Sequence, residues 1–304
     1  MIQLRSILTV FLISIITVCG AQNKDELLEK EAVLALEDAV AVGTVGPSQI
    51  ELNNFGEIAL PNGYIFLPKV ESERFLKSIG NLNTEKTVGI IIGADDEHFG
   101  EYCIWISYYN NGFIKDDEAN SWDKNKLLKD IIRNTEKENI ERQRLGFPVP
   151  NVDGWIEAPS YDFKTHRAFW SLSVNEDGQA MVNSKALILG RTGYYVALLL
   201  TSKTDFAKNA VFFRDILEKI NFKAGSTYAD YDVNTDTASS YTLAGLVTGI
   251  VAKEIGLFAL IAAIVVKFWK IVVIGGAISL WAGIKKFINL IKNRFNHKVS
   301  EIKQ

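Results

Sequence analysis

The middle of the chain alternates between segments with the apolar spacing of helices and segments with that of strands. Residues 24–40 (KDELLEKEAVLALEDAV) and 71–80 (ESERFLKSIG) mix charged and apolar positions as helices do, and the second ends at a glycine. Residues 57–68 (EIALPNGYIFLP), 86–93 (KTVGIIIG) and 101–109 (EYCIWISYY) are rich in β-branched and aromatic residues. Such composition favours strands, the first of them interrupted by a Pro-Asn-Gly turn.

Two further helices are predicted from apolar stripes. In residues 122–146, Leu128, Ile132 and Thr135 share one face opposite charged residues, so we expect a mostly solvated helix that ends at Gly146. Residues 204–220 carry apolar side chains at alternating spacings of four and three, which predicts a helix packed on a sheet. These side chains are Phe206, Ala210, Phe213, Leu217 and Ile220.

Two hairpins are expected in the second half of the domain. Residues 152–158 would pair with 166–174, and residues 185–190 with 194–200. The consecutive apolar residues of YYVALLL favour a strand buried on both faces, hence central in its sheet. Because the strands pair as hairpins among interspersed helices, the predicted class is α+β with a mainly antiparallel sheet, plus a C-terminal transmembrane helix.

The first 21 residues have the layout of a secretory signal peptide. Arg5 precedes an apolar run that ends at Val18, and the small residues Cys19 and Ala21 mark a cleavage site. Two alternatives stay open. The run could be a short, uncleaved anchor, or Cys19 could carry a lipid, although Val18 is large for a lipoprotein signal.

A second apolar region, residues 242–284, is expected to be a transmembrane or membrane-associated segment. A span needs about 20 residues, so the region holds one tilted helix with an extension or a tight pair of helices, and one crossing is the simpler interpretation. A span over 242–266 would bury Lys253 and Glu254, whereas a span over 255–276 leaves them at its entry. A charged side chain near the bilayer centre costs about 2.5–3.5 kcal/mol. The second register leaves Lys267 and Lys270 part-way along the span, but it spares an acidic residue from the bilayer centre and lets the two long lysine side chains snorkel, so it is favoured.

Charge is distributed unevenly along the chain. Residues 242–304 hold nine of the 33 basic and two of the 36 acidic residues, and Arg5 is the one charge in residues 1–21. The stretch between them therefore has a net charge of about −11. An acidic body argues against nucleic-acid binding, because phosphates need a positive patch. Basic residues gather on the cytoplasmic side of membranes, so residues 285–304 are expected to be a cytoplasmic tail.

These features predict four parts. They are a signal peptide (1–21), an exported α+β domain (22–241) whose polar end from about residue 224 is a linker, the membrane segment (242–284) and the basic tail (285–304). The chain would then be a single-pass protein of the cell membrane, with its main domain on the extracytoplasmic, periplasmic side. Cys103 would be the one cysteine left after signal removal, and its strand-like surroundings favour a buried, inert thiol.

The stretch GWIEAPSYDFKTHRAFW, residues 154–170, holds the residue types of a hydrolytic site. As a catalytic base, His166 would need a second group at hydrogen-bond distance, and Asp116 or Asp117 is the partner that we consider. Tyr161, Asp162, Glu157 and Arg191 are candidates by residue type only. The sequence contains no nucleophile-elbow, zinc-protease, phosphate-loop or paired Cys-x-x-Cys motif, which counts against the common enzyme classes.

A structural role for His166 is the favoured interpretation. At the start of a strand, His166 would share a face with the apolar row Ala168, Trp170, Leu172 and Val174, and its ring would close the core. Asp162 and Thr165 would shape the turn by bonding to nearby groups.

Several stretches together resemble a bacterial family of predicted membrane-anchored proteins, a domain of unknown function. The stretches are LPNGYIFLP (60–68), GFIKDDEA (112–119), residues 154–170, LGRTGYYVALLL (189–200) and FKAGSTYADY (222–231), followed by Thr235-Asp236, Tyr241 and the apolar tail. Tyr231 stands where the family usually has phenylalanine. The resemblance implies a membrane-anchored architecture and no activity, and it defines no functional residue.

Two acidic clusters supply oxygen atoms that suit a hard cation. They are residues 94–98 (ADDEH) and 115–119 (KDDEA), and neither has the alternating spacing of a calcium loop. Asp116 and Asp117 are the preferred metal candidates because they lie in a stretch that carries the resemblance.

The leading hypothesis is a non-enzymatic binding or assembly module at the envelope, with no cofactor. The alternative is an envelope hydrolase that uses His166 with Asp116 or Asp117. The expected partners are the membrane and an envelope ligand or protein. Homo-oligomer formation is a further hypothesis, since small residues four apart let membrane helices approach closely. These residues are Gly245 with Gly249, Ala259 with Ala263, and Gly275 with Ser279 and Gly283.

Overall fold

The computed structural model describes residues 24–78, 81, 84–93, 102–145, 149–176 and 178–249. The expected signal peptide, the acidic cluster 94–98, the membrane segment from residue 250 on and the basic tail lie outside the described residues. Within the described ranges, no helix combines the length and the hydropathy that a membrane crossing needs.

The secondary structure follows the expected order of elements. The strands are β1 (Thr44–Val45), β2 (Ser48–Glu51), β3 (Gly56–Leu60), β4 (Tyr64–Pro68), β5 (Thr87–Gly93), β6 (Cys103–Tyr109), β7 (Asn151–Asp162), β8 (Arg167–Glu176), β9 (Gln179–Leu189), β10 (Tyr194–Ser202) and β11 (Ile220–Phe222). The helices are α2 (Lys24–Val42), α3 (Lys69–Ser78), η1 (Asp117–Ser121), α4 (Lys124–Leu145), α5 (Phe206–Lys219), η2 (Tyr228–Asp230) and α6 (Leu243–Thr248).

The strands form a large and a small sheet. The large sheet has the order β1-β4-β5-β6-β10-β9-β8-β7, its neighbours pair antiparallel, and the small sheet has the order β11-β3-β2. Both expected hairpins are present, as β7–β8 and β9–β10. Strand β10 lies inside the sheet, with Leu198 opposite Trp105 of β6 and Lys185 of β9. The predicted α+β class with a mainly antiparallel sheet is therefore confirmed.

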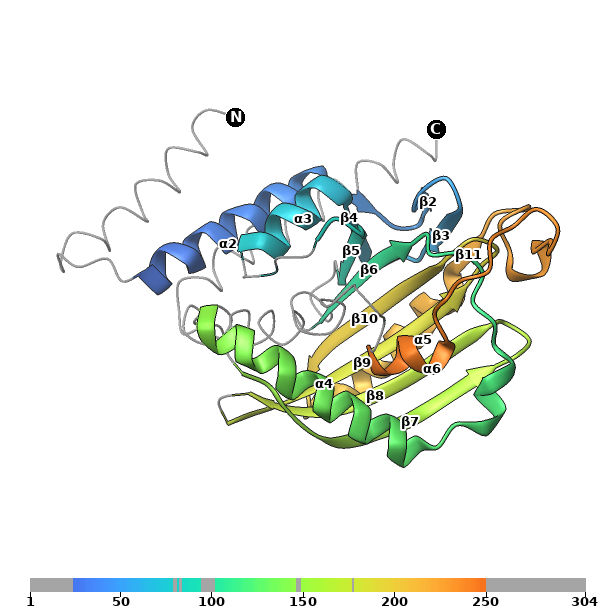
Figure 1. The fold of residues 1–304 in the computed structure, drawn as a ribbon. Helices are drawn as coiled ribbons and strands as arrows, with labels where there is room; N and C mark the ends of the chain where they lie inside the picture. Colours follow the sequence, from blue (N-terminus) through green and yellow to red (C-terminus); the bar gives the residue numbers. More distant parts are fainter. Residues whose placement is uncertain are drawn as a thin grey trace, which may run out of the picture.

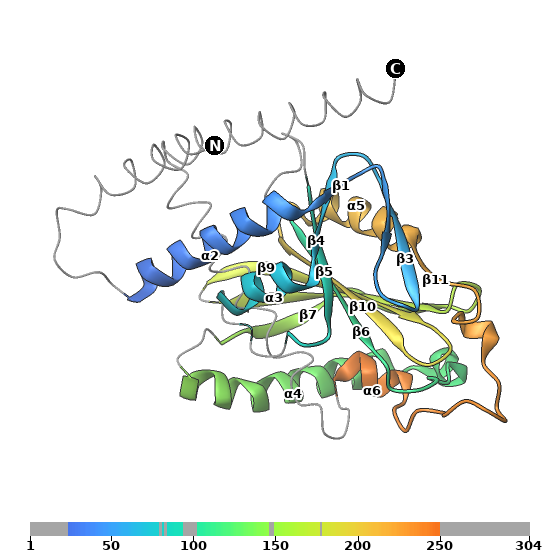
Figure 2. The same cartoon turned by 90° about the horizontal axis from the view of Figure 1, so that it is seen from above.

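Helices cover both faces of the large sheet (Figures 1 and 2). One face packs against α5 and the small sheet, through buried side chains such as Phe213 and Ile58. The other face is covered in two parts, by α2 and α3 over β4–β6 and by α4 and α6 over β7–β9. The expected row Ala168, Trp170, Leu172 and Val174 is buried beneath α4 and α6.

Two further predictions on buried residues are confirmed. Four of the five residues of the expected α5 stripe, Ala210, Phe213, Leu217 and Ile220, are buried against the sheet, and the fifth, Phe206 at the start of the helix, is half-buried. Cys103 is a buried, free thiol, and burial raises its pKa to about 12, which keeps it protonated and unreactive.

Helix α4 buries a face other than the expected one, so that prediction was wrong. Leu127 and Ile131 are buried, but further along the same face the buried side chain is Glu138, while Ile140 is 70% exposed. The apolar stripe turns polar where the charge of Glu138 interacts with that of the buried Lys185 of β9. The residues first expected to form the stripe, Leu128, Ile132 and Thr135, are half-buried.

Helix α6 is part of the domain core. Leu243, Leu246 and Val247 are fully buried in the apolar cluster under α4. Thr242 caps the helix by accepting a hydrogen bond from the backbone N–H of Gly245 at 3.0 Å, and Gly249 ends it in the left-handed conformation with φ 73°. The packed domain therefore extends beyond residue 241, where the sequence alone placed its end.

Residues 224–241, which the sequence suggested as a linker, lie folded on the domain. Thr227 and Asp230 form a capping box at the start of η2. The guanidinium of Arg191 donates two hydrogen bonds to the carboxylate of Asp236, at 2.7 and 2.9 Å. Phe113 forms a parallel bridge with Ala238.

Candidate functional site

The turn of the β7–β8 hairpin is held by the side chains that the sequence indicated. Asp162 accepts hydrogen bonds from the backbone N–H of Lys164 at 2.9 Å and from the hydroxyl of Thr165 at 2.8 Å. His166 ends the turn with φ 51°, a conformation that few residues other than glycine adopt, and its carbonyl accepts from the N–H of Leu189. The expectation that His166 begins the strand was off by one residue, because β8 starts at Arg167.

Asp116 joins His166 although 50 residues separate them in the sequence. Its Oδ2 lies 3.0 Å from the Nδ1 of His166 and accepts a hydrogen bond of 2.8 Å from the hydroxyl of Tyr161. A carboxylate can only accept, so the Nδ1 of His166 carries the proton. We call these three residues the His166 corner.

Aromatic rings close the His166 corner. The ring of Tyr228 stacks on that of His166, with centroids 3.9 Å apart and an interplanar angle of 20°. The hydroxyl of Tyr228 donates to the carbonyl of Ile114 at 2.9 Å, and Phe113 stacks on Tyr231 at 3.8 Å. The loop after β6, the hairpin turn and η2 are thereby fixed to one another.

The His166 corner has the chemistry of a polarised histidine. The hydrogen bond from Nδ1 to Asp116 leaves Nε2 as the ring nitrogen that can take up a proton. Burial, the hydrogen bond to Asp116 and the charge of Asp116 raise the pKa of Tyr161 far above its ordinary range, so Tyr161 serves as a donor and not as a base. Among the described residues, no hydrogen bond to Nε2 from a serine, threonine or cysteine is found.

The other candidates named from residue type make no hydrogen bond to the side chain of His166 in the described part of the chain. Asp117 begins η1, and no hydrogen bond to His166 is found for it in the described part of the chain. Glu157 contacts Arg214 of α5, on the opposite face of the sheet, and accepts from Ser171. Arg191 pairs with Asp236, and this hydrogen bond lowers the pKa of Asp236.

In the described part of the chain, no third ligand joins His166 and Asp116 to complete a metal site. His166 and Asp116 are two potential ligands in contact, but within the described ranges no three His, Cys, Asp or Glu side chains gather as a metal site requires.

A second polar cluster lies buried under α4, and sequence reasoning missed it. Lys185 of β9 is 3% exposed, and Glu138 of α4 is 7% exposed beside the buried Arg142. Burial lowers the pKa of Lys185 to about 7 against the opposing charge of Glu138. Burial also raises the pKa of Glu138 to about 7, opposed by Lys185 and Arg142. We call these residues the Lys185 cluster.

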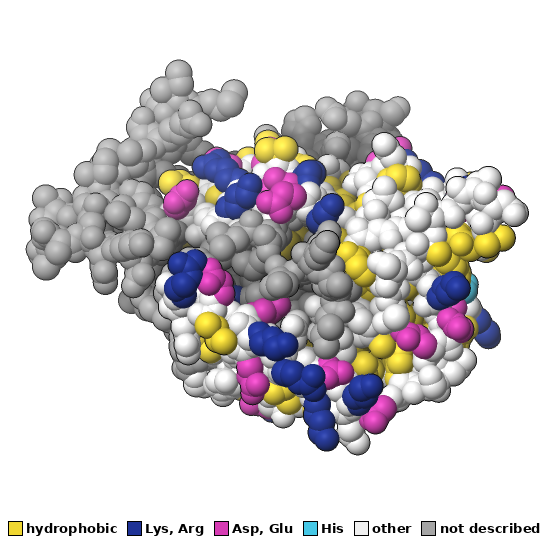
Figure 3. Space-filling model, in the orientation of Figure 1, with side chains coloured by type: hydrophobic (Ala, Val, Ile, Leu, Met, Phe, Trp, Pro, Cys, Tyr) yellow, Lys and Arg dark blue, Asp and Glu magenta, His cyan; other side chains and the backbone are white. Residues whose placement is uncertain are grey.

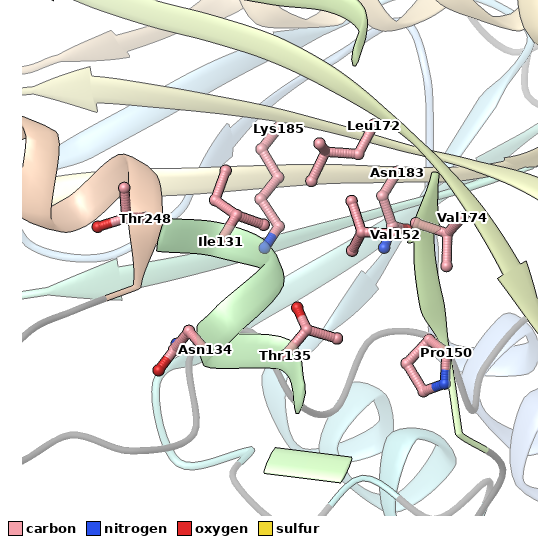
Figure 4. Close-up of a pocket in the computed structure, with 10 residues that line it drawn as sticks. All are labelled: Ile131, Asn134, Thr135, Pro150, Val152, Leu172, Val174, Asn183, Lys185 and Thr248. Atoms are coloured by element: carbon pink, nitrogen blue, oxygen red, sulfur yellow. The ribbon is translucent and has the colours of Figure 1, made fainter. Parts of the chain in front are cut away.

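The Lys185 cluster borders a small cavity of about 30 Å³ (Figure 4). The side chain of Lys185 reaches from the sheet toward α4, between Ile131 and Thr135. Asn183 of β9 and Thr248 of α6 also line the cavity. This volume suits a bound water molecule and not an organic substrate.

One signal in the sequence could have indicated the Lys185 cluster. Leu127, Ile131, Glu138 and Arg142 recur at helical spacings of four and seven, so a single face of α4 carries both apolar and charged residues. Lys185 likewise has the strand parity of Leu187 and Leu189, which face the core. Both patterns place a charge on an inward face.

Comparisons with solved structures give low similarity scores. The solution structure of cyanobacterial PsbP (CyanoP) from Synechocystis sp. PCC 6803 is 10% identical with a TM-score of 0.36, and the match covers 60% of this chain and 99% of that one. The Ran-binding protein Mog1p of Saccharomyces cerevisiae is 13% identical with a TM-score of 0.30, with 59% and 96% covered. None of the curated proteins matches the chain.

A family profile matches residues 44–277, a stretch that contains the His166 corner, the Lys185 cluster and α6. The match confirms the expected family of unknown function, whereas a bacterial source and a membrane anchor stay predictions. Because the match covers well over half of the chain, this protein belongs to the family described as "Protein of unknown function (DUF2167)".

Proposed function

We propose that the chain is a membrane-anchored envelope protein whose α+β domain is a binding or assembly module. The domain would lie on the extracytoplasmic side of the cell membrane, after export by the N-terminal signal, with the basic tail in the cytoplasm. The apolar sequence from residue 250 and the excess of basic residues after residue 284 support this topology.

The observation that carries the proposal is the integration of α6 into the domain. Leu243, Leu246 and Val247 are buried beside α4, so they are not available to lipid. This supports a membrane span that begins near Ile255 over one that begins at Thr242. In that register Lys253 and Glu254 stand between the domain and the membrane, where charged side chains stay hydrated.

The short connection supports a module that works at the membrane surface. Only residues 250–254 separate Gly249 from the proposed span, and five extended residues reach at most about 18 Å. A domain held so closely can present its outer face to other envelope components while its inner face stays near the bilayer.

The polar contacts of the His166 corner support a structural role for it. Asp116 accepts from both Tyr161 and His166, and the ring of Tyr228 covers one face of the imidazole. Such contacts fix the loop after β6 to the hairpin, as a rigid binding surface requires.

Reporter fusions test the proposed topology. A reporter that is active only outside the cytoplasm should work when fused after Gly249 and fail when fused after Gln304. Fusion after Gly249 keeps α6 in place, which a fusion before residue 242 would not. Activity at both positions would mean two crossings or none, and the proposed anchor would then be wrong.

An envelope hydrolase is the second candidate, favoured by the 3.0 Å contact between His166 and Asp116. The full chain in detergent would be assayed on a panel of ester, phosphate and glycoside substrates, beside His166→Ala and the control Asp117→Asn. Turnover that His166→Ala abolishes and Asp117→Asn retains would establish the hydrolase and reject the binding module. Absence of turnover over the whole panel agrees with the module.

A further inference from the structure

The solvent-facing side of α4 carries a continuous row of basic residues. Positions 126, 129, 133, 137 and 144 follow one another at helical spacings and therefore share one face, opposite the buried Leu127 and Ile131. The five side chains, which we call the α4 basic row, are Lys126, Lys129, Arg133, Lys137 and Arg144, and all are exposed. Dark-blue side chains mark the course of α4 in Figure 3, with acidic ones at its flanks.

The α4 basic row is an exception on an acidic body, since residues 22–241 have a net charge of about −11. Arg133 pairs with the half-buried Asp130 at 2.9 Å, and Arg144 pairs with the exposed Glu141, both within the helix. In the described part of the chain, no ion pair is found for Lys126, Lys129 or Lys137. The row keeps a positive potential that invites an anionic partner.

One apolar side chain stands in this row. Ile140 is 70% exposed and follows Lys137 at a spacing of three. A single isoleucine adds little apolar area, so contact of this side of α4 with a bilayer surface would come mainly from its cations and the lipid phosphates.

The α4 basic row lies beside the point where the chain leaves the described domain. The side-chain amide of Asn134 is 3.5 Å from the carbonyl of Gly249, and α6 packs along α4 (Figure 2). Arg133 precedes Asn134, and Lys137 follows it by one helical turn. With at most about 18 Å of chain between Gly249 and the proposed span, this side of α4 is held near the membrane.

We infer that the α4 basic row of this protein binds anionic phospholipid headgroups of the membrane that anchors the chain. The inference rests on the proposed anchor and adds an orientation to it: the side of the domain that carries α4 and α6 faces the bilayer. The face covered by α5 and the small sheet then points away from the membrane and is open to envelope partners.

Lysine labelling of the reconstituted full chain tests this inference. The chain would be placed in vesicles of phosphatidylcholine, with or without phosphatidylglycerol, and acetylated with a membrane-impermeant reagent followed by peptide mass spectrometry. We expect Lys126, Lys129 and Lys137 to react roughly threefold more slowly or less in the anionic vesicles, because headgroup phosphates hold the ammonium groups. Lys219 on α5 is the control and should react equally in both.

A matched pair of variants sharpens the test. Lys129→Gln with Lys137→Gln should abolish the protection of Lys126, whereas Lys203→Gln with Lys219→Gln should leave it unchanged. Equal labelling in both vesicle types, while alkaline carbonate leaves the chain in the membrane pellet, would overturn the lipid contact and keep the anchor. Release of the chain by carbonate would instead reject the proposed function on which the inference rests.

Discussion

The His166 corner and the Lys185 cluster lie on the same face of the large sheet, and both border the apolar cluster under α4 and α6. In the corner, the side chains of His166 and Asp116 are 28% and 17% exposed and make direct, short hydrogen bonds between loops. In the cluster, charges stand on regular elements and are almost fully buried. In the His166 corner, partial contact with solvent lowers the free-energy cost of burying polar groups. In the Lys185 cluster, that cost must be offset by attraction between the buried charges.

The comparison teaches where polar groups matter for stability in this domain. The corner connects the loop after β6 to the hairpin turn by hydrogen bonds, beside ring contacts such as that of Phe113 with Tyr228. The cluster lies between α4 and β9, where an apolar pair would pack at least as well. A buried ionic group retained at such a place limits stability and makes it dependent on pH.

The largest expected effect is that of Lys185→Met. It leaves Glu138 without its opposite charge on β9 and should lower the free energy of unfolding by about 3–5 kcal/mol. Urea unfolding of the full chain in detergent, followed by near-ultraviolet circular dichroism, measures this. Lys164→Met, at the exposed hairpin turn, is the control and should change the value by less than about 0.5 kcal/mol. A loss of unfolding free energy below about 1 kcal/mol for Lys185→Met would show that Lys185 and Glu138 do not stabilise each other.

The double variant Lys185→Met with Glu138→Gln separates the effect of an uncompensated charge from the effect of lost packing. Because the charges of Lys185 and Glu138 are removed together, and the buried Arg142 is present in the single and the double variant alike, the double variant should recover more than half of the loss, about 2 kcal/mol or more. Additive losses would mean that each side chain acts through packing and not through charge.

The pH dependence of stability should have a minimum contributed by this pair. Glu138 has a folded pKa of about 7, raised from 4.5, so the folded state holds a proton that the unfolded chain releases, and stability falls as pH rises from about 4.5 to 7. Lys185 has a folded pKa of about 7, lowered from 10.5, so stability rises again as pH goes from about 7 to 10.5. The measurement is the unfolding free energy of the parent chain minus that of the double variant, taken from pH 5 to 9. This difference should have its lowest value near pH 7. A difference independent of pH would contradict both shifts.

A smaller effect is expected for Asp116→Ala in the His166 corner. Tyr161 and His166 lose their common acceptor, but both can turn partly to water, so the loss should be about 1–2 kcal/mol. The neighbouring Asp117→Ala should change stability by less than about 0.5 kcal/mol, since it makes no comparable contact. The same urea assay serves, and equal effects of the two variants would remove the distinction between the carboxylates.

The smallest effect is expected for His166→Asn. Asparagine tolerates the positive φ of 51° better than most residues and can still donate to Asp116, so the change should stay below about 1 kcal/mol. A loss of more than about 2 kcal/mol would show that the stacking of His166 on Tyr228 is the main interaction in the corner.

Much of the fold could be predicted because its elements carry strong local patterns. The stripe of α5 and the apolar row of β8 each repeat at a helical or strand period, so the inward face followed from spacing alone. The turn of the β7–β8 hairpin was also readable, since Asp162 and Thr165 bond to groups within three residues. The sequence also suggested His166 with Asp116 or Asp117, but it could not decide between the two carboxylates or indicate that Tyr161 shares the acceptor.

Local sequence determined the helices, the strands, the hairpins and the side chains that could do chemistry. Tertiary structure alone chose Asp116 over Asp117, brought Tyr228 onto His166, and buried Glu138 while it left Ile140 exposed on the surface of the domain. It also placed α6 in the core, although its residues read as the beginning of a membrane segment. The physical reason is common to these cases. Whether a side chain points into the core or pairs with another group depends on which neighbour supplies a complementary surface, and that neighbour lies tens of residues away in the chain.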